Sequence, residues 1–222
     1  MTTDKPWPPS TGLATVVIPR GKATLETPYS IVVHAPASLV FDTVLRIADY
    51  PAWNTWVPAG RILTHPPPAP GAEDEDPNDL SRMRVGSTME FEVIMDASKP
   101  NDIHRTPLKV MDISTPAAPS SYVSPELLED PSFTADLSKV YRVAWKGNGG
   151  MMGLAPTCER FHEVIVISDN ECEVRSWELM SGVTAKIVKA MYENTLKEKV
   201  ALWCTDLKRY CEQKHAQASS AT

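Results

Sequence analysis

Hydrophobic and polar residues alternate along several stretches in the middle of the chain. On one face of residues 86–96 the side chains are apolar, namely Met89, Phe91, Val93 and Met95. The intervening positions include two glutamates, so the pattern predicts a strand in a sheet with one buried and one solvated face. Comparable segments predict further strands over residues 27–36, 57–65, 106–115, 139–148, 155–168 and 171–182.

Two other regions carry apolar residues at helical spacing. Residues 37–50 predict two short helices directly after the first strand, because Pro51 disfavours helical geometry just before it. Residues 183–215 contain no Gly or Pro, and their apolar positions are 187, 188, 191, 196, 200, 203, 207 and 211. These steps of mainly three or four predict a long amphipathic C-terminal helix.

Together these elements predict an α+β fold. A first strand and two short helices precede the rest of a curved antiparallel sheet of about six to seven strands, and the long helix comes last. The apolar face of this sheet must be buried, and only the C-terminal helix is long enough to cover it. A curved sheet wrapped around one helix need not close tightly, so we expect a cavity between them.

Proline-rich and polar stretches set the domain limits. The segment 65–80 contains five of the chain's 20 prolines together with several acidic residues, and it predicts an extended loop with little to bury. We therefore expect an N-terminal extension over 1–26, with a frayed end at 1–12. One domain spans 27–214, with loop insertions near 65–85 and 116–138. The last segment, 215–222, is expected to be a disordered tail.

The overall charge is modest and negative, formally -6. Since no block of Lys and Arg is present, we expect no nucleic-acid partner. We also expect no secretory signal and no transmembrane segment, and hence a cytoplasmic location. The cysteines at 158, 172, 204 and 211 lack a C-x-x-C spacing. We expect Cys204 and Cys211 to be reduced and to share the inner face of the long helix.

Three stretches resemble the START-like superfamily, also called SRPBCC, which includes polyketide cyclase/dehydrase and lipid-transfer proteins. They are "VVHAPASLVFDTVLRIADYPAWNTWVP", "VYRVAWKGN", and "ERFHEVIV" followed by "CEVRSWELMSG". The resemblance covers roughly residues 27–213 and implies the helix-grip fold, in which a curved antiparallel sheet wraps around a long C-terminal helix. The insertions at 65–80 and 116–138 depart from the compact pattern of the family.

The aromatic stretch "DYPAWNTWVP" has two interpretations. In a helix-grip fold it turns the chain from the short helices into the second strand, with Asp49 accepting backbone N–H groups and Trp53 filling the end of the core. Alternatively, Trp53, Asn54 or Trp56 contacts a ligand at the edge of the cavity.

A cavity between sheet and helix is expected to be mainly apolar. The predicted ligand-binding residues are Trp53, Phe91, Val93, Met95, Trp145, Met152, Trp177, Ile187, Met191 and Thr195, and Val188 is a further lining residue expected from the helix. The competing interpretation is a packed core, in which the same side chains fill the space and no cavity remains.

Four polar residues are candidates for catalysis. Ring closure of a polyketone by aldol chemistry needs a base for an acidic C–H and a donor for the developing oxyanion. His162 or Glu178 is the predicted base, and Tyr141 or Arg160 is the predicted donor. Strand residues face water about as often as the core, so the competing interpretation for His162 and Glu178 is a side chain that is solvent-exposed or structurally hydrogen-bonded.

The glycine-rich stretch "GNGGMMG" at 147–153 does not predict a phosphate site, because a strand and not a helix follows it. It is interpreted as a hairpin loop whose methionines border the cavity mouth. The sequence has no metal-binding or nucleotide-binding motif, so we expect no metal and no cofactor.

Three functions remain open at this point. The leading hypothesis, which the resemblance implies, is a cyclase-like enzyme that closes a ring in a polyketide or terpenoid-type intermediate by aldol or pericyclic chemistry. The first alternative is a non-catalytic carrier of a lipid, sterol or quinone, with a wholly apolar lining. The second is an interaction module whose cavity is filled. In the first two cases the partner is a hydrophobic small molecule, and the chain is a monomer or a homodimer.

Overall fold

The computed structural model describes residues 6–67, 76, 78–148 and 156–220. Among these residues a single antiparallel sheet has eight strands, arranged in the order β1-β8-β7-β6-β5-β4-β3, and β2 also pairs with β8. The strands are β1 (Leu25–Glu26), β2 (Tyr29–Val33), β3 (Ala59–Thr64), β4 (Thr88–Ile94), β5 (Ile103–Ser114), β6 (Val140–Gly147), β7 (Thr157–Ser168) and β8 (Glu171–Ser181). The strand count is slightly above the expected six to seven, because β1, a two-residue strand just before the first predicted strand, also pairs with β8.

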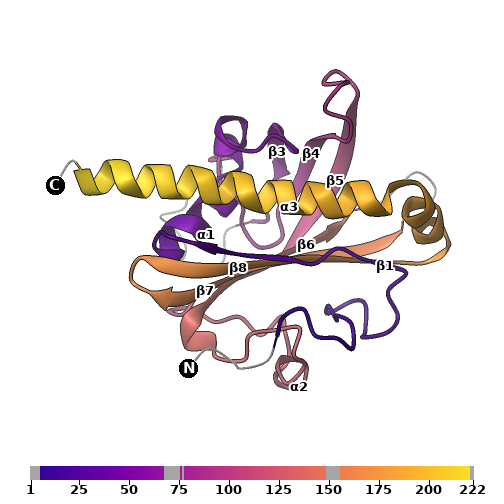
Figure 1. Cartoon of the computed structure of the whole chain (residues 1–222), viewed down its shortest axis with the longest axis horizontal. Helices are drawn as coiled ribbons and strands as arrows, with labels where there is room; N and C mark the ends of the chain where they lie inside the picture. Colours follow the sequence, from indigo (N-terminus) through magenta and orange to yellow (C-terminus); the bar gives the residue numbers. More distant parts are fainter. Residues whose placement is uncertain (1–5, 68–75, 77, 149–155, 221–222) are drawn as a thin grey trace.

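The helices occupy both sides of this sheet. They are α1 (Ala37–Leu45), the 3-10 helix η1 (Ile47–Ala52), α2 (Pro125–Leu128), the 3-10 helix η2 (Leu137–Lys139) and α3 (Val183–Ser220). Figure 1 shows α3 lying across one face of the sheet, with the N-terminal segment and α2 on the opposite face. The α+β architecture with a long helix against a curved sheet is confirmed.

The inner face of the sheet packs against α1, η1 and α3 in one hydrophobic core. From α3 it receives mainly Leu196, Val200, Trp203, Leu207 and Cys211, which recur at helical spacing. Cys204 and Cys211 are both fully buried and are free thiols, as expected. Burial raises the pKa of the Cys204 thiol to about 12, so this side chain is an uncharged part of the core.

The outer face is also covered over β6, β7 and β8, which the sequence did not predict. Leu13 and Ile18 from the N-terminal segment and Phe133 from the 116–138 insertion pack there against Phe161 and Trp177. The frayed N-terminus predicted for 1–12 is therefore wrong from residue 6 onward, because Trp7 stacks edge-on against Trp177 with ring centroids 5.8 Å apart. At β3, β4 and β5 the outer face carries exposed ion pairs, between Arg61, Arg105 and the two β4 glutamates.

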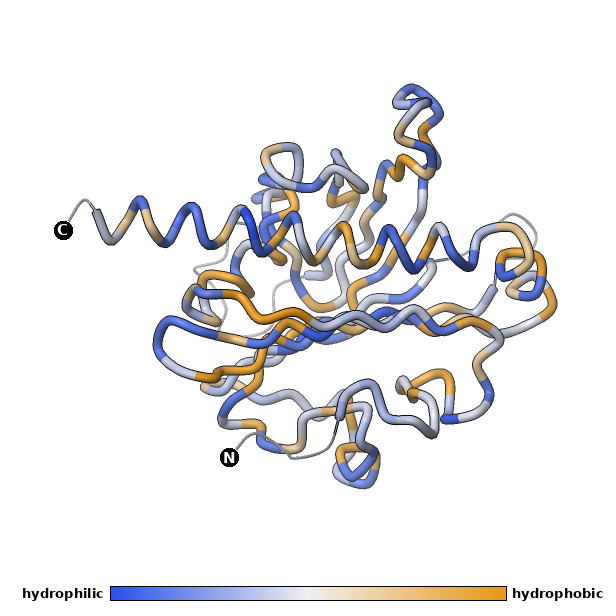
Figure 2. Tube along the Cα trace, viewed as in Figure 1, coloured by the Kyte–Doolittle hydropathy of each residue, from blue (hydrophilic) through white to orange (hydrophobic). Residues whose placement is uncertain are grey.

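The C-terminal helix continues past its predicted end. The tail was expected to begin at 215, but α3 continues to Ser220. In Figure 2 the part of α3 that projects beyond the sheet is largely blue and pale, in keeping with its exposed side chains. No helix within the described residues has both the length and the apolar character that spanning a bilayer requires.

The aromatic corner is built differently from the prediction. Asn54, and not Asp49, organises the turn: its Oδ1 accepts hydrogen bonds from the backbone N–H groups of Trp56 at 3.1 Å and Val57 at 2.7 Å. Asp49 pairs instead with the Arg46 side chain at 3.0 Å. By accepting backbone N–H groups two and three residues later, the Asn54 side chain closes a turn, and β3 begins directly after it.

Candidate functional site

A cavity of about 250 Å³ lies between the inner face of the sheet and α3. Its walls come from the connection between η1 and β3, from strands β4 to β8, and from α3. Its lining residues are Trp56, Val57, Phe91, Val93, Met95, His104, Thr106, Leu108, Trp145, Arg160, Glu178, Met180, Val188, Tyr192 and Leu196. Most of these side chains are apolar or aromatic, which is typical of a small-molecule site.

The cavity has a buried inner end and a more open outer end. Trp56, Trp145 and Leu196 are buried, and they form the inner end together with Phe91, whose ring lies edge-on to Trp145 at 5.7 Å. His104 is exposed, and Val188 and Tyr192 are only partly buried. The mouth therefore lies between the start of β5 and the first turns of α3.

One ion pair stands in the wall of the cavity. Arg160 of β7 and Glu178 of β8 are direct cross-strand partners, so their side chains emerge side by side on the inner face. Arg160 Nη2 donates to Glu178 Oε2 at 2.9 Å, and the two side chains are 5% and 15% exposed. The guanidinium also lies over the Trp56 ring at 4.8 Å, a cation–π contact that holds it against the wall.

The pair is incompletely hydrogen-bonded. Within the described part of the chain, Arg160 Nη1 and Glu178 Oε1 have no partner, and the buried Arg160 Nε has none either. A guanidinium offers five N–H donors and a carboxylate about four acceptor positions, so most of this capacity is unused. The wall thus presents one donor and one acceptor next to each other.

His162 does not line the cavity, although it shares the inner face of β7 with Arg160. Its ring is fully buried between Trp145 and Trp203, with centroids 4.5 and 4.3 Å away. Burial, and secondarily the nearby Arg160 charge, hold its pKa well below the usual range, so the ring is neutral. Neither ring nitrogen has a hydrogen-bond partner among the described residues. This enclosed position does not fit the predicted role of a base that contacts a ligand.

Several other predicted residues lie outside the cavity. Trp177 is on the outer face, where its indole N–H donates to the Ala14 carbonyl at 3.0 Å. Trp53 is in the core between Tyr50 and Trp203 and not at the cavity wall. On α3, Ile187 and Met191 are 57% and 62% exposed.

The remaining predictions fall elsewhere. Thr195 lines a shallow depression on α3, separate from the cavity. Tyr141 lines a second groove, described below. Met152 and most of the glycine-rich loop lie outside the described residues. The predicted residues that the structure brings together are Phe91, Val93, Met95, Trp145, Arg160, Glu178 and Val188.

Sequence reasoning found only one of the three α3 residues that line the cavity. It named Val188 together with Ile187 and Met191, and it missed Tyr192 and Leu196. Val188, Tyr192 and Leu196 follow one another at steps of four. The same stripe continues through Val200 and Trp203, which are buried against the sheet. Tracing this buried stripe backward from the C-terminal half would have placed 188 and 192 inward and 187 and 191 outward.

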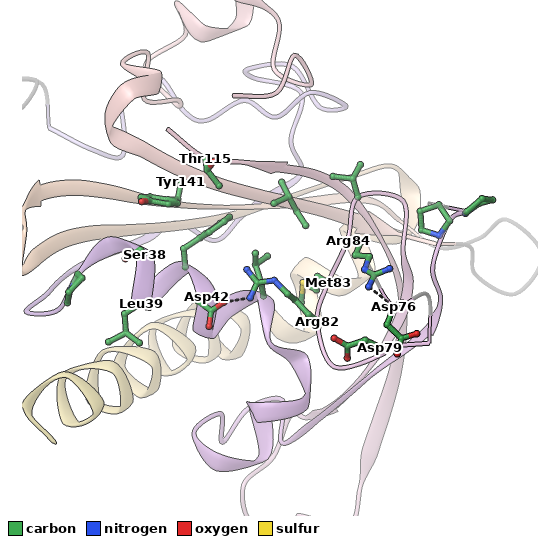
Figure 3. A pocket seen from close by; sticks show the side chains of 17 residues that line it. Ser38, Leu39, Asp42, Asp76, Asp79, Arg82, Met83, Arg84, Thr115 and Tyr141 are labelled. Carbon is green, nitrogen blue, oxygen red and sulfur yellow. Dashed lines mark hydrogen bonds and ion pairs between the residues drawn. The ribbon is translucent and has the colours of Figure 1, made fainter. Parts of the chain in front are cut away.

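A larger groove of about 1,240 Å³ lies between α1, the ends of β5 and β6, and the loop before β4 (Figure 3). Its charged side chains already pair with partners in the protein: Arg82 with Asp42, and Arg84 with the Asp76 carbonyl. Its border includes Pro67 and Asp76, on either side of residues outside the described part. The described residues alone therefore do not define this groove, and the cavity is the candidate site.

Comparisons with known proteins agree on the fold. No protein-family model matches the chain, and no curated protein matches it in sequence. The hypothetical protein jhp0584 from Helicobacter pylori has a similar structure, with a TM-score of 0.60 at 12% identity over 86% of this chain and 90% of that chain. A START superfamily protein from Mycobacterium smegmatis gives 0.54 at 12% identity over 85% and 97%.

A third similar structure is the Zhui aromatase/cyclase from a Streptomyces species, with a TM-score of 0.56 at 9% identity over 85% of this chain and 94% of that chain. At these identities the likeness concerns fold alone. The chain has the START-like helix-grip fold, as its sequence motifs implied.

Proposed function

We propose that the protein binds a compact, mainly apolar small molecule in the cavity between the sheet and α3. The observation that carries the proposal is the Arg160–Glu178 pair in a wall otherwise formed by apolar and aromatic side chains. Burial of apolar ligand surface contributes about 25 cal/mol per Å², and the pair orients one polar group. The volume of about 250 Å³ lies just below the usual range for small-molecule sites, so it suits a compact ligand.

Within this proposal the protein is a cyclase-like enzyme that closes a ring in a polyketide- or terpenoid-type intermediate. In an aldol closure a base removes a proton from an acidic C–H, the resulting enolate carbon bonds to a carbonyl carbon, and negative charge moves to that carbonyl oxygen. Glu178 Oε1 accepts the proton, and Arg160 Nη1 donates to the oxyanion. The small cavity holds the chain bent, with the reacting carbons close together. The similarity in fold to an aromatase/cyclase supports this choice of reaction.

The alternatives fit the cavity less well. A carrier of a lipid, sterol or quinone was expected to have a wholly apolar lining, and the ion pair in the wall argues against it. An interaction module with a filled core was expected to have no pocket of roughly 300 Å³ or more and to expose a large apolar patch instead. The cavity of about 250 Å³ falls just below that limit, so the ion pair in its wall, and not its volume, favours a binding site. His162 takes no part in the proposed reaction because it is enclosed by aromatic rings.

The test compares two tryptophan substitutions on adjacent residues of α3. Val188→Trp fills the cavity mouth, whereas Ile187→Trp places the same side chain on the exposed side of the helix. Native mass spectrometry of freshly purified protein, followed by extraction, is expected to find a co-purifying apolar compound with the wild type and I187W and none with V188W. Equal occupancy in both variants, or toluene binding that V188W leaves unchanged, would contradict the proposal.

Once the compound is identified, its open-chain precursor is the substrate for a turnover assay. Glu178→Gln is expected to lower the rate of ring closure by about 10²- to 10⁴-fold, the usual contribution of a general base. An unchanged rate would remove the enzymatic part of the proposal and leave the binding part standing.

A further inference from the structure

The inner wall of the cavity carries a balanced charge. Arg160 and Glu178 contribute one charge of each sign. Two titratable groups that interact electrostatically with this pair are uncharged at neutral pH. Burial raises the pKa of the Cys158 thiol to about 12, and burial lowers the pKa of the His162 ring well below its usual range. His104, the other titratable group of the lining besides Tyr192, stands at the exposed mouth.

This balance sets what a bound polar group can be. A ligand carboxylate would approach Arg160 but would also face the Glu178 carboxylate beside it, and it would leave the cavity with a net negative charge. A ligand ammonium would leave a net positive charge. Burying an unpaired charge in an apolar, largely buried space is strongly unfavourable. A charged ligand therefore binds well only if a group of opposite sign pairs with it.

The unused hydrogen-bonding positions agree with this argument. Among the described residues Arg160 Nη1 has a free donor and Glu178 Oε1 a free acceptor. The two atoms that do pair, Arg160 Nη2 and Glu178 Oε2, are 2.9 Å apart. A group with a hydrogen-bond acceptor beside a donor satisfies both positions at once without adding charge.

We infer that the cavity selects ligands whose polar end is uncharged and carries an acceptor oxygen next to a donor, as in an enolised 1,3-dicarbonyl, a lactam or a carboxamide. The inference rests on the proposed binding function and specifies the substrate class of that same site. An enolised 1,3-dicarbonyl belongs to this class and is also a substrate for aldol closure. Carboxylates and amines of the same size are selected against.

Three probes that share one ring and differ in the polar group test the inference. Benzamide is neutral with an acceptor and a donor, benzoate is an anion, and benzylammonium is a cation; toluene serves as the apolar reference. Calorimetric titration of the wild type at neutral pH is expected to give benzamide a dissociation constant at least about tenfold below those of the two ions, and also below that of toluene.

Charge-removing variants are expected to change this order. Glu178→Gln leaves the Arg160 charge alone, so benzoate should gain at least about tenfold relative to benzamide. Arg160→Gln leaves the Glu178 charge alone, so benzylammonium should gain instead. The exchange R160E/E178R keeps the balance and should keep benzamide first. Val188→Trp is the control for the cavity and should weaken every probe.

The outcomes separate this inference from the proposed function. If toluene binds and V188W weakens it, but the wild type prefers benzoate or benzylammonium or does not distinguish benzamide from toluene, the inference is wrong and the binding site remains. If no probe binds, toluene included, both are wrong. The ranking on the wild type needs no variant to fold, so an unstable variant does not decide the result.

Discussion

Two buried Arg–Glu pairs lie on opposite faces of the same sheet, and they differ in how completely they are hydrogen-bonded. On the outer face Arg142 Nε and Nη2 both donate to Glu163 Oε1, at 2.8 and 2.6 Å, and the two side chains are 1% and 0% exposed. Thr134, from the loop above the pair, contacts both side chains. Its backbone carbonyl accepts a hydrogen bond from Arg142, and its backbone N–H and its hydroxyl donate to Glu163. On the inner face Arg160 and Glu178 share a single bond at 2.9 Å.

The hydrogen bonds of a buried pair separate structural from functional polar groups in this fold. A pair whose partners come from a loop closed over it, as with Arg142 and Glu163, holds that loop to the sheet, and both oxygens of its carboxylate are occupied. A pair that borders a cavity and keeps a free donor and acceptor, as with Arg160 and Glu178, has capacity for a ligand. Burial alone does not distinguish the two, because both pairs are largely shielded from solvent.

The largest effect is expected for breaking the outer pair. Arg142→Met leaves the Glu163 carboxylate buried without its counter-ion, and we expect a loss of about 3–5 kcal/mol in the free energy of unfolding. The measurement is urea denaturation followed by tryptophan fluorescence. Arg61→Met, which removes an exposed partner of Glu90 and Glu92, is the control and should change stability by about 1 kcal/mol or less. Equal effects of the two variants would show that the outer pair is not structural.

A somewhat smaller effect is expected from the N-terminal segment on the outer face. Leu13 is fully buried against the sheet, so Leu13→Ala should lower the free energy of unfolding by about 2–5 kcal/mol. Binding of toluene should be unchanged, since the cavity is on the other face. Leu196→Ala, in the cavity wall, is the matched comparison and should alter both stability and binding. A stability loss below about 0.5 kcal/mol for L13A would mean that the N-terminal segment is not part of the fold.

The smallest effect is expected from His162, through pH. The folded protein holds this ring neutral, whereas in the unfolded chain it binds a proton below about pH 6.5. The unfolded state therefore takes up more protons, and stability that is present above pH 6.5 is lost as the pH falls, by up to about 1.4 kcal/mol per pH unit. Urea midpoints between pH 7 and 5 should show this slope in the wild type and a reduced slope in His162→Phe. His215→Gln, in the exposed end of α3, controls for the loss of a histidine; a slope unchanged in H162F would refute the assignment.

Much of the fold was predictable because its signals are local. The alternation in 86–96 corresponds to β4, and the Gly- and Pro-free stretch after Gly182 corresponds to α3. Strand periodicity also placed Arg160 and Glu178 on the faces where they are found, with Trp177 opposite Glu178. Neighbouring residues of a strand point to opposite faces, so Trp177 and Glu178 cannot both contact one ligand. A site that included both residues was therefore already excluded by the alternation of side chains along this strand.

Depth within the fold was not predictable in this way. His162 and Arg160 are two residues apart on the same face, yet one is enclosed by tryptophan rings and the other borders the cavity. On α3 a shift of one position, from Val188 to Ile187, rotates a side chain by about 100° and moves it from the cavity wall to solvent.

The order and type of the elements follow from the sequence, because hydrophobic periodicity reports which face of each strand or helix avoids water. The sequence also indicated the helix-grip arrangement and the two charged residues of the cavity wall, Arg160 and Glu178. Which inner-face residues border empty space, and which segment covers the outer face, became known from the three-dimensional arrangement. Both depend on contacts between residues more than a hundred positions apart, such as Ala14 with Trp177 and Arg20 with Asp130, and local patterns carry no record of such contacts.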